Sequence, residues 1–391
     1  MKEKLSLPKG WEMRTVGDVC ERGSSNVSQN QLDNEVGDYP IFGASGLIKN
    51  VSFYHQKKPY LSIVKDGSGV GRVTKMNAYT SVIGTLQYIL PKENIDLNYL
   101  FYNLISIDFK KYVAGAAIPH IYFKDYKNEP FLWMPLPEQQ HIVAILDEAF
   151  AAIAKAKANA EQNLKNAKEL FESYLQGVFE NGNWETRTIQ EITKVINGYA
   201  FASKDFKSTN TIKSIKITNV GVKEFVEEVD NYLPEKFKDT LKEVQVREGN
   251  IVIALTRTII SAGLKVAVVP ASYDGALVNQ RVAALVPNEK IINQRYLYNF
   301  LTTDGVAKYV LAHVNTLMQP NLSINDLKNL PVPCPTIKEQ SDIVKKLDGL
   351  RSEVRKLEAI YQQKINDLEE LKKSVLQKAF SGELKTATAV V

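Results

Sequence analysis

The sequence contains only two cysteines and four histidines among 391 residues. Cys20 and Cys334 are far apart, and neither has neighbours at metal-ligand spacing, so we expect two reduced thiols and no zinc site. No stretch approaches the roughly 18 apolar residues that a membrane-spanning helix needs. The opening residues, MKEKLSLPKGW, lack the apolar core of a signal peptide. We therefore expect a cytoplasmic protein.

Motifs that carry catalysis are also missing. H-E-x-x-H, C-x-x-C and G-x-S-x-G do not occur, and neither do the motifs of an adenine or cytosine methyltransferase. The segment GSGVG at 67–71 has neither the spacing of a dinucleotide-binding loop nor the Lys-Ser/Thr of a phosphate-binding loop. Asp125-x-Lys127 and Asp326-x-Lys328 resemble half of a nuclease motif, but their duplication favours a structural role. We expect no catalysis, no metal and no cofactor on this chain.

One stretch of the sequence occurs twice. Residues 136–179 are echoed by residues 337–380 without a gap, at a constant shift of 201 positions. A repeat of this length decides the architecture and is read before any other feature. Matching residues in the two copies include Glu138 and Glu339, Gln139 and Gln340, Ile142 and Ile343, Leu146 and Leu347, Asp147 and Asp348, Leu170 and Leu371, Leu175 and Leu376, and Phe179 and Phe380.

Both copies predict one long helix. Apolar residues recur in alternating steps of four and three, which is typical of a coiled-coil seam. Asn163 and Lys364 interrupt the two seams at equivalent positions. The predicted seams are Ile142, Leu146, Ala149, Ile153, Ala156, Ala160, Asn163, Ala167, Leu170 and Tyr174 in the first helix, and Ile343, Leu347, Leu350, Val354, Leu357, Tyr361, Lys364, Leu368, Leu371 and Val375 in the second.

Connectivity sets the direction of the two helices. A helix of some 42 residues is roughly 60 Å long. The second helix starts where the first has delivered the chain, so it can pair with the first only by running back. We therefore predict an antiparallel coiled coil with an approximate two-fold internal repeat, carrying globular domains at opposite ends in inverted orientations.

Two similar globular regions flank the helices. Strand-like and helix-like segments are mixed in both, which predicts an α+β fold class. The opening Gly10-Trp11-Glu12 of the first region is mirrored by Asn183-Trp184-Glu185 in the second. The predicted boundaries are residues 1–135 for the first globular domain, 136–180 for the first helix, 181–335 for the second globular domain, 336–381 for the second helix and 382–391 for a tail.

The positive charge lies on the globular regions. Lys and Arg outnumber Asp and Glu by 16 to 13 in residues 1–130 and by 18 to 15 in residues 181–333. Acidic residues outnumber basic ones by 7 to 4 in residues 131–180. This distribution permits local contacts to nucleic acid without demanding them.

The duplicated motifs resemble the specificity subunit of type I restriction–modification enzymes over nearly the whole chain. The resemblance rests on G-W-E at 10–12 with its N-W-E echo at 183–185, on PLPEQQHIVAILD at 135–147, on TIKEQSDIVKKLD at 336–348 and on LQKAFSGEL at 376–384. The first helix ends LQGVFENGNWE, so only LQ-x-x-F matches that last motif.

The resemblance implies two target-recognition domains, each reading one half of a split, asymmetric site in double-stranded DNA. It also implies two methyltransferase subunits docked on the helices, and restriction subunits that join them. S-adenosylmethionine would be bound by the methyltransferase partners, and ATP and Mg²⁺ would belong with the restriction subunits. The helices would then set the unread spacing between the half-sites.

Candidate base readers are polar side chains on loops near the strands and the turn before each helix. Arg can donate two hydrogen bonds to guanine, and Gln or Asn can pair with adenine. For the helices, outward Phe150, Phe171 and Leu175 are candidate contacts for the partner subunits, or they pack on the recognition domains. The candidate DNA-binding residues are Lys65, Ser68, Arg72, Gln87, His120 and Tyr122 in the first domain, and Thr256, Arg257, Ser261, Gln280, Arg281, Gln319 and Asn321 in the second.

Two other interpretations stay open at this point. The chain could serve a methyltransferase that works without a restricting nuclease. It could instead be a coiled-coil tether that never touches DNA. The neighbouring genes would test the first alternative, and a gel shift with the methyltransferase partner would test the second.

Overall fold

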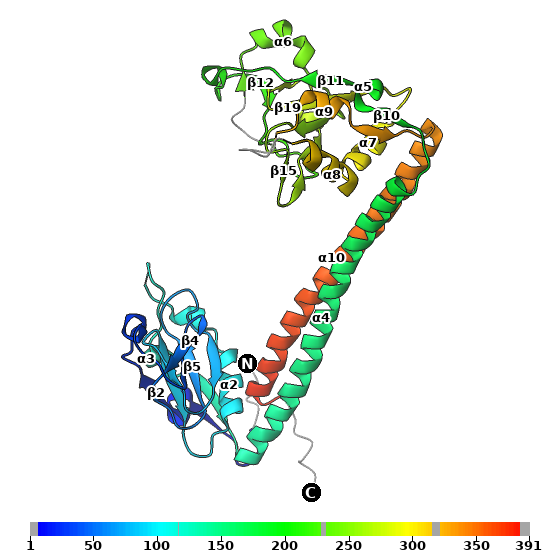
Figure 1. Cartoon of the computed structure of the whole chain (residues 1–391). Helices are drawn as coiled ribbons and strands as arrows, with labels where there is room; N and C mark the ends of the chain where they lie inside the picture. Colours follow the sequence, from blue (N-terminus) through cyan, green and yellow to red (C-terminus); the bar gives the residue numbers. More distant parts are fainter. Residues whose placement is uncertain (1–6, 116, 228–231, 315–320, 384–391) are drawn as a thin grey trace. The chain divides into compact units, whose positions relative to one another are not determined.

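The computed structural model of the chain describes residues 7–115, 117–227, 232–314 and 321–383. The chain divides into two compact units, Met1–Gln162 with Tyr361–Val391 and Asn163–Ile360. Each unit combines one globular domain with part of both long helices (Figure 1). Both domains mix helices and sheets, which confirms the predicted α+β class with two similar domains.

Domain 1, which precedes the first long helix, is built on a four-stranded antiparallel sheet in the order β2-β8-β5-β6. A three-stranded sheet, β4-β3-β7, shares a hydrophobic core with one face of it. All five residues of β5 are buried, because both faces of this strand are covered. The strands are β1 (Glu12–Thr15), β2 (Cys20–Ser24), β3 (Tyr39–Gly43), β4 (Gly46–Val51), β5 (Tyr60–Val64), β6 (Val73–Met76), β7 (Ser81–Val82), β8 (Leu86–Pro91) and β9 (Pro130–Trp133).

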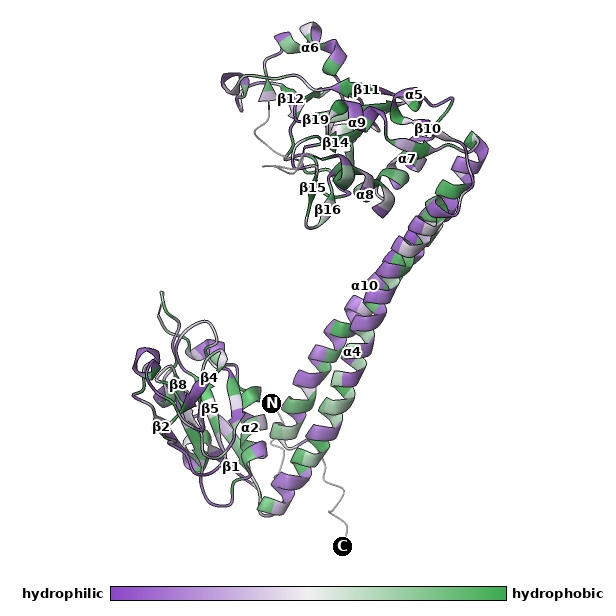
Figure 2. Cartoon of the chain, viewed as in Figure 1, coloured by the Kyte–Doolittle hydropathy of each residue, from purple (hydrophilic) through white to green (hydrophobic). Residues whose placement is uncertain are grey.

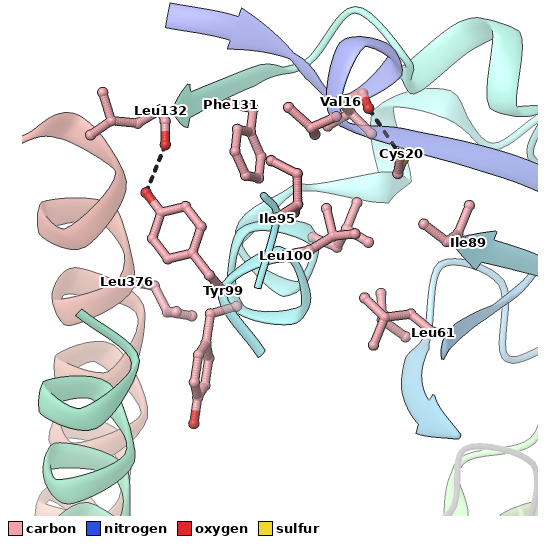
Figure 3. Packing of buried hydrophobic residues seen from close by; sticks show 14 of the residues in the cluster. Val16, Cys20, Leu61, Ile89, Ile95, Tyr99, Leu100, Phe131, Leu132 and Leu376 are labelled. Carbon is pink, nitrogen blue, oxygen red and sulfur yellow. Dashed lines mark hydrogen bonds between the residues drawn. The ribbon is translucent and has the colours of Figure 1, made fainter. Parts of the chain in front are cut away.

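The other face of this sheet is covered by α2 (Leu97–Ser106). This helix starts at Asp96, whose carboxylate accepts hydrogen bonds from the backbone N–H groups of Asn98 and Tyr99. Figure 3 shows Tyr99 among apolar side chains from the strands and from the last turns of the second long helix. The remaining helical segments of domain 1 are α1 (Val16–Val19), η1 (Gln29–Leu32), η2 (Phe109–Tyr112) and α3 (Phe123–Tyr126).

Domain 2, which lies between the two long helices, repeats this topology. Its four-stranded sheet has the order β11-β19-β14-β17, and its three-stranded sheet the order β13-β12-β18. The hairpin β15-β16 stands in the connection where domain 1 has only a short loop. The strands are β10 (Thr186–Thr188), β11 (Thr193–Asn197), β12 (Ile212–Ile215), β13 (Tyr232–Leu233), β14 (Ile251–Ala254), β15 (Ile259–Ile260), β16 (Gly263–Leu264), β17 (Val266–Val268), β18 (Leu277–Val278), β19 (Val282–Pro287) and β20 (Pro331–Pro333).

Helix α7 in domain 2 corresponds to α2 in domain 1 and packs on the equivalent sheet. The helical segments are α5 (Ile189–Ile192), η3 (Ser203–Asp205), α6 (Lys236–Thr240), η4 (Lys242–Val244), η5 (Ala271–Tyr273), α7 (Gln294–Leu301), α8 (Asp304–His313) and α9 (Ile324–Lys328).

The two long helices are α4 (Leu136–Glu180) and α10 (Ile337–Ser381), which confirms both predicted helices. In the first unit, the ammonium of Lys157 lies 2.5 Å from a carboxylate oxygen of Glu369. In the second unit, the guanidinium of Arg351 lies over the ring of Phe171. Phe150 also lies under Lys372 in the first unit, and Val178 lies near Ile343 in the second. Within each unit, residue numbers therefore rise along α4 as they fall along α10, and the pairing is antiparallel. Figure 2 shows apolar residues interspersed with polar ones along both helices.

The predicted seam of the first helix is correct in the middle of that helix and wrong towards its C-terminal end. In the second helix Val354 is buried, but the predicted seam residue Leu357 is 37% exposed. Ile153, Ala160 and Ala167 are buried as predicted. Leu170 and Tyr174 are exposed, and the next residue along, Leu175, is buried in place of Tyr174. An α-helix has 3.6 residues per turn, so the contacting face drifts by about 20° per heptad relative to strict 3.5-residue counting. After four heptads this drift approaches the angle between neighbouring residues. The second helix shows the same displacement, with Leu371 exposed and Leu376 buried.

Candidate nucleic-acid interface

Two loops of domain 1 lie side by side at one end of its central sheet. The connection from β5 to β6 contacts the loop that follows η2 through backbone hydrogen bonds. The N–H of Gly67 donates to the carbonyl of Pro119 over 2.9 Å, and the N–H of Ile121 donates to the carbonyl of Lys65 over 2.9 Å. The structure therefore brings together candidate residues that lie about 50 positions apart in the sequence, as a shared DNA-contacting surface would require.

Five of the six candidates in domain 1 lie on these two loops. Ser68 and Arg72 are exposed, and the guanidinium of Arg72 donates to the carbonyl of Ala44. The half-buried ammonium of Lys65 lies 3.6 Å from Asp66 Oδ2. On the second loop, the rings of His120 and Tyr122 meet edge to face, with centroids 4.9 Å apart. Polar tips and an exposed aromatic ring thus share one surface.

Gly71 gives the first loop its shape. Its φ is +84°, a conformation that favours glycine, and an added Cβ would lie 2.6 Å from Cβ of Phe109. The loop therefore passes close to η2 only because this position has no side chain.

Gln87 does not belong to this surface, and its prediction as a DNA reader is not compatible with its burial. Only 3% of the residue is exposed, and its side-chain amide donates to the hydroxyl of Tyr126 over 2.5 Å. β8 is a central strand with both faces covered, so a polar residue at an alternating position faces the core instead of solvent.

The equivalent loops of domain 2 meet in the same way. Thr256 forms a β-bridge with Asn321, and the N–H of Leu322 donates to the carbonyl of Leu255 over 2.9 Å. The N–H of Leu255 donates to the carbonyl of Arg281 over 2.8 Å. Four predicted readers therefore gather at one place: Thr256, Arg257, Arg281 and Asn321.

Arg257 adopts a backbone conformation that few non-glycine residues occupy. Its φ is +49°, and its side chain is exposed on the connection after β14. Such conformations cost of order 1–3 kcal/mol and concentrate at functional sites. Among the candidates in the described part of domain 2, this strain singles out Arg257.

The other candidates of domain 2 have mixed positions. Ser261 is exposed in the turn of the β15-β16 hairpin, and Gln280 is exposed on the loop between β18 and β19. Gln319 lies outside the described residues.

Tyr199 was not among the predicted candidates, although it is 45% exposed and its carbonyl accepts the N–H of Gln280 over 3.0 Å. The signal for it was a Gly-Tyr pair directly after a strand, where an exposed aromatic ring can stack on a nucleotide.

The three predicted subunit contacts on the helices pack inward. Leu175 is 1% exposed in the core of the second unit, and Phe171 is partly buried beside it. Phe150 is partly buried against domain 1, with its ring centroid 5.4 Å from that of Tyr102. Packing on the domains is the alternative that the sequence left open for these three residues, and Leu175, only 1% exposed, has almost no surface to offer a partner subunit.

The duplicated Asp-x-Lys segments lie in two short, equivalent helices. Asp125 lies in the single-turn helix α3, and Asp326 lies in the equivalent α9. The hydroxyl of Ser323 donates to Asp326 over 2.5 Å, and the same hydroxyl accepts the N–H of Asp326 over 3.0 Å. Within residues 7–115, 117–227, 232–314 and 321–383, no group of three or more His, Cys, Asp or Glu side chains is arranged to hold a metal ion.

Together these observations define a protein built from two copies of one α+β domain, each presenting a pair of polar loops, on a pair of long antiparallel helices. The profile of the family described as the type I restriction modification DNA specificity domain matches residues 8–165 and 181–370. The chain belongs to this family, and it carries two target-recognition domains as a type I specificity subunit.

Individual relatives agree with this assignment. The chain is 24% identical to the type I restriction enzyme MjaVIII specificity subunit of Methanocaldococcus jannaschii, covering 97% of this chain and 94% of the relative. It is 21% identical to the EcoDI specificity subunit of Escherichia coli, covering 97% and 89%.

Solved structures share the fold. A structure described in work on complex assembly and conformational transition of the type I R-M system matches with a TM-score of 0.72 and 17% identity over 97% of this chain and 100% of that one. The HsdS subunit of Thermoanaerobacter tengcongensis matches with a TM-score of 0.61 and 17% identity over 98% and 100%. In the described parts of this chain, no helix has the length and apolar character that crossing a membrane requires.

Proposed function

We propose that this chain recognises a split, asymmetric DNA site, with each domain reading one half, and performs no chemistry itself. The observation that carries the proposal is the pair of equivalent loop clusters. The connection after β5 in domain 1 and the connection after β14 in domain 2 hold the same place in the topology. Domain 1 presents Ser68 and Arg72 there, and domain 2 presents Arg257 and a hairpin.

Equivalent loops that carry different side chains allow each domain to recognise a different DNA half-site in the same way. Arg and Asn at such loops can read guanine and adenine edges, whereas Lys more often contacts phosphate. Because the exposed residues of the two clusters differ, we propose that the two half-sites have unrelated sequences. The site as a whole is then asymmetric.

We further propose that two methyltransferase subunits bind the helices. Leu170 in the second unit and Leu371 in the first are equivalent positions of the repeat. They are 55% and 48% exposed, and these exposed fractions are large for leucines on a helix that pairs with another helix. One equivalent apolar position in each unit suits two copies of one partner better than a single copy. These residues replace Phe150, Phe171 and Leu175 as the proposed contacts.

Chemistry and restriction would come from the partners. We propose that the methyltransferase subunits bind S-adenosylmethionine and that restriction subunits, with ATP and Mg²⁺, complete the enzyme. The named relatives are subunits of type I restriction enzymes, which supports a restriction partner over a system that only methylates.

Gel shifts with the full chain and its methyltransferase partner test the proposal. The probes are a duplex carrying the complete site, found by mapping methylated adenines in the host genome, and two duplexes in which one half is scrambled. We expect tight binding to the complete site and weaker, comparable binding to each half alone. No shift with any duplex would indicate a tether that does not touch DNA. A single contiguous motif in the methylation map would contradict the bipartite site.

A further inference from the structure

Each recognition domain is joined to the start of its long helix through one buried glutamine. Gln139 and Gln340 are both 0% exposed and occupy equivalent positions of the repeat, in the first turns of α4 and α10. Glutamine is among the residues that are rarely fully buried. Two such residues at the same point of two domain–helix junctions need a physical explanation.

In the first unit, the amide of Gln139 ties α2 to α4. Its nitrogen donates to the carbonyls of Asn94 and Met134 over 2.9 and 2.7 Å. Its oxygen accepts the N–H of Asp96, the residue that caps α2, over 2.9 Å. One side chain therefore pairs backbone groups on both sides of the junction.

In the second unit, Gln340 makes the same set of contacts between α7 and α10. Its nitrogen donates to the carbonyls of Ile291 and Pro335 over 3.0 and 2.8 Å. Its oxygen accepts the N–H of Asn293, the residue that caps α7, over 2.7 Å. The two amides thus make equivalent hydrogen bonds in domains whose sequences differ widely.

An aromatic pair accompanies each glutamine. The hydroxyl of Tyr99 donates to the carbonyl of Leu132 over 2.8 Å, as Figure 3 shows, and that of Tyr296 donates to the carbonyl of Pro333 over 3.0 Å. Phe380 and Phe179 pack on these two tyrosines, each pair with its ring centroids 5.2 Å apart. Interplanar angles of 59° and 57° make the two arrangements nearly identical.

The contacts of the acid eight residues after each glutamine are not shared. In the first unit, the hydroxyl of Tyr102 donates to Asp147. In the second unit, Asp348 pairs with the guanidinium of Arg295 at 2.7 Å. Both halves do retain the geometry of the Gln–Tyr–Phe group and the side-chain caps of α2 and α7. This is expected if both domains must be held at the same angle on their helices.

A continuous set of packed elements connects these junctions to the proposed reading loops. In the first unit, α2 packs on β5, and β5 leads directly into the loop of Lys65 and Ser68. Any tilt of α2 on α4 would therefore move that loop relative to the helix. The same relation holds in the second unit for α7, β14 and Arg257.

We infer that Gln139 and Gln340 are positioning residues that fix the angle of each recognition domain on the helices, and that they thereby set how strictly the spacing between the two half-sites is read. The inference rests on the proposed bipartite recognition. It assigns to these residues a part in spacer discrimination that is separate from reading bases.

The test compares Gln139→Met and Gln340→Met with the unaltered chain, each with its methyltransferase partner. Methionine has a similar volume but leaves three backbone groups without their amide partner. Gln139→Glu keeps an acceptor for the N–H of Asp96 but places a buried carboxylate against the carbonyls of Asn94 and Met134, so it is the more disruptive variant. The matched control is Gln140→Met, at the exposed neighbouring position.

Affinities are measured for the complete site, for sites with one base pair added to or removed from the spacer, and for each single half-site. For Gln139→Met and Gln340→Met we expect half-site affinity to change by less than about twofold, while preference for the native spacer falls about tenfold. Gln139→Glu should lose at least as much of the preference for the native spacer as Gln139→Met, and the control should match the unaltered chain.

Unchanged spacer preference in both methionine variants would overturn the inference. Loss of single half-site binding by the altered domain would also overturn it, because the glutamine would then be needed for the fold of that domain. Alkylation of the buried Cys20 in the Gln139→Met variant shows whether domain 1 is still folded, because slow labelling indicates an intact domain core. If the unaltered chain binds complete and half-scrambled sites equally, bipartite recognition itself fails, and the inference fails with it.

Discussion

The ring of Phe380, in the last turn of α10, packs on the ring of Tyr99 in domain 1 with centroids 5.2 Å apart. The end of the second helix is thereby part of the hydrophobic core of a domain near the other end of the sequence. Leu376 and Ala379, 6% and 1% exposed, belong to the same core. Domain 1 therefore depends on residues that follow it by more than 200 positions.

Phe380→Ala should destabilise domain 1 while leaving domain 2 intact. The ring is only partly buried, so we expect a loss of about 2–3 kcal/mol, near the lower end of the values for buried Phe→Ala. The measurement is alkylation of Cys20, which lies in this core and whose pKa burial raises to about 12. Cys20 should label faster in the variant and Cys334 at an unchanged rate.

Phe179→Ala is the matched control, because Phe179 packs on Tyr296 in domain 2 with the same centroid distance. It should speed labelling of Cys334 and leave Cys20 protected. Equal effects of both variants on both thiols would show that the two domains unfold as one unit.

Acid should weaken the start of α10 through Glu339. The N–H and the hydroxyl of Thr336 donate to this carboxylate over 2.9 and 2.7 Å, which lowers the pKa of Glu339 below its ordinary value of 4.5. A folded-state pKa below the unfolded one stabilises the fold above pH 4.5, and the contribution is lost as the pH falls through the folded value. Melting temperatures of Glu339→Gln should therefore fall less steeply below pH 4.5 than those of the unaltered chain. The control is Glu370→Gln on the exposed face of the same helix, and its melting temperature should depend on pH as that of the unaltered chain does. If its melting temperature instead changed with pH as that of Glu339→Gln does, the role assigned to Glu339 would be contradicted.

An acidic residue at either of the two equivalent exposed leucines should prevent one methyltransferase subunit from binding. A buried, unpaired carboxylate in an apolar contact is strongly unfavourable. We expect Leu170→Asp and Leu371→Asp each to leave a complex with one methyltransferase, and the double variant to leave none. Size-exclusion chromatography with light scattering measures the stoichiometry. Complexes with two methyltransferases in the double variant would exclude this surface.

Shortening both helices equally should shorten the spacer of the DNA site. Removing residues 158–164 of α4 and 360–366 of α10 keeps the register in which Lys157 pairs with Glu369. Seven residues correspond to about 10 Å of helix, or about three base pairs of DNA. A methylation map should show the same two half-sites separated by a shorter spacer. Altered half-sites with the original spacer would refute the idea that the helices set the spacing.

The sequence predicts the long helices well because their signal is local and occurs twice. A gapless repeat and a heptad pattern sustained over more than four heptads sufficed for α4 and α10. The same counting failed at Leu170 and Tyr174, because it assumed a strict period of 3.5 residues while the helix drifts.

The candidate site could be predicted only in part, because burial depends on what covers a strand. A turn separates β7 from β8 and another separates β18 from β19, and the two strands of each pair belong to different sheets although they lie only a few residues apart. Gln87 was assigned to the surface although the sheet containing β8 is covered on both faces. The roles of Gln139 and Gln340 were missed because their partners are backbone groups of other segments, which no local pattern reveals.

Arg257 offers the most direct test of the claim that each domain reads its own half-site. Replacing Arg257 with Ala, in the enzyme with its methyltransferase partners, should degrade one half of the methylated motif at one or two positions. Loss of a side chain that forks onto guanine costs about 1–3 kcal/mol at that base and relaxes the choice there. The other half-site and the spacer should be unchanged in a genome-wide map of methylated adenines. Degradation of both half-sites together, or a uniform loss of methylation with the motif intact, would contradict the account.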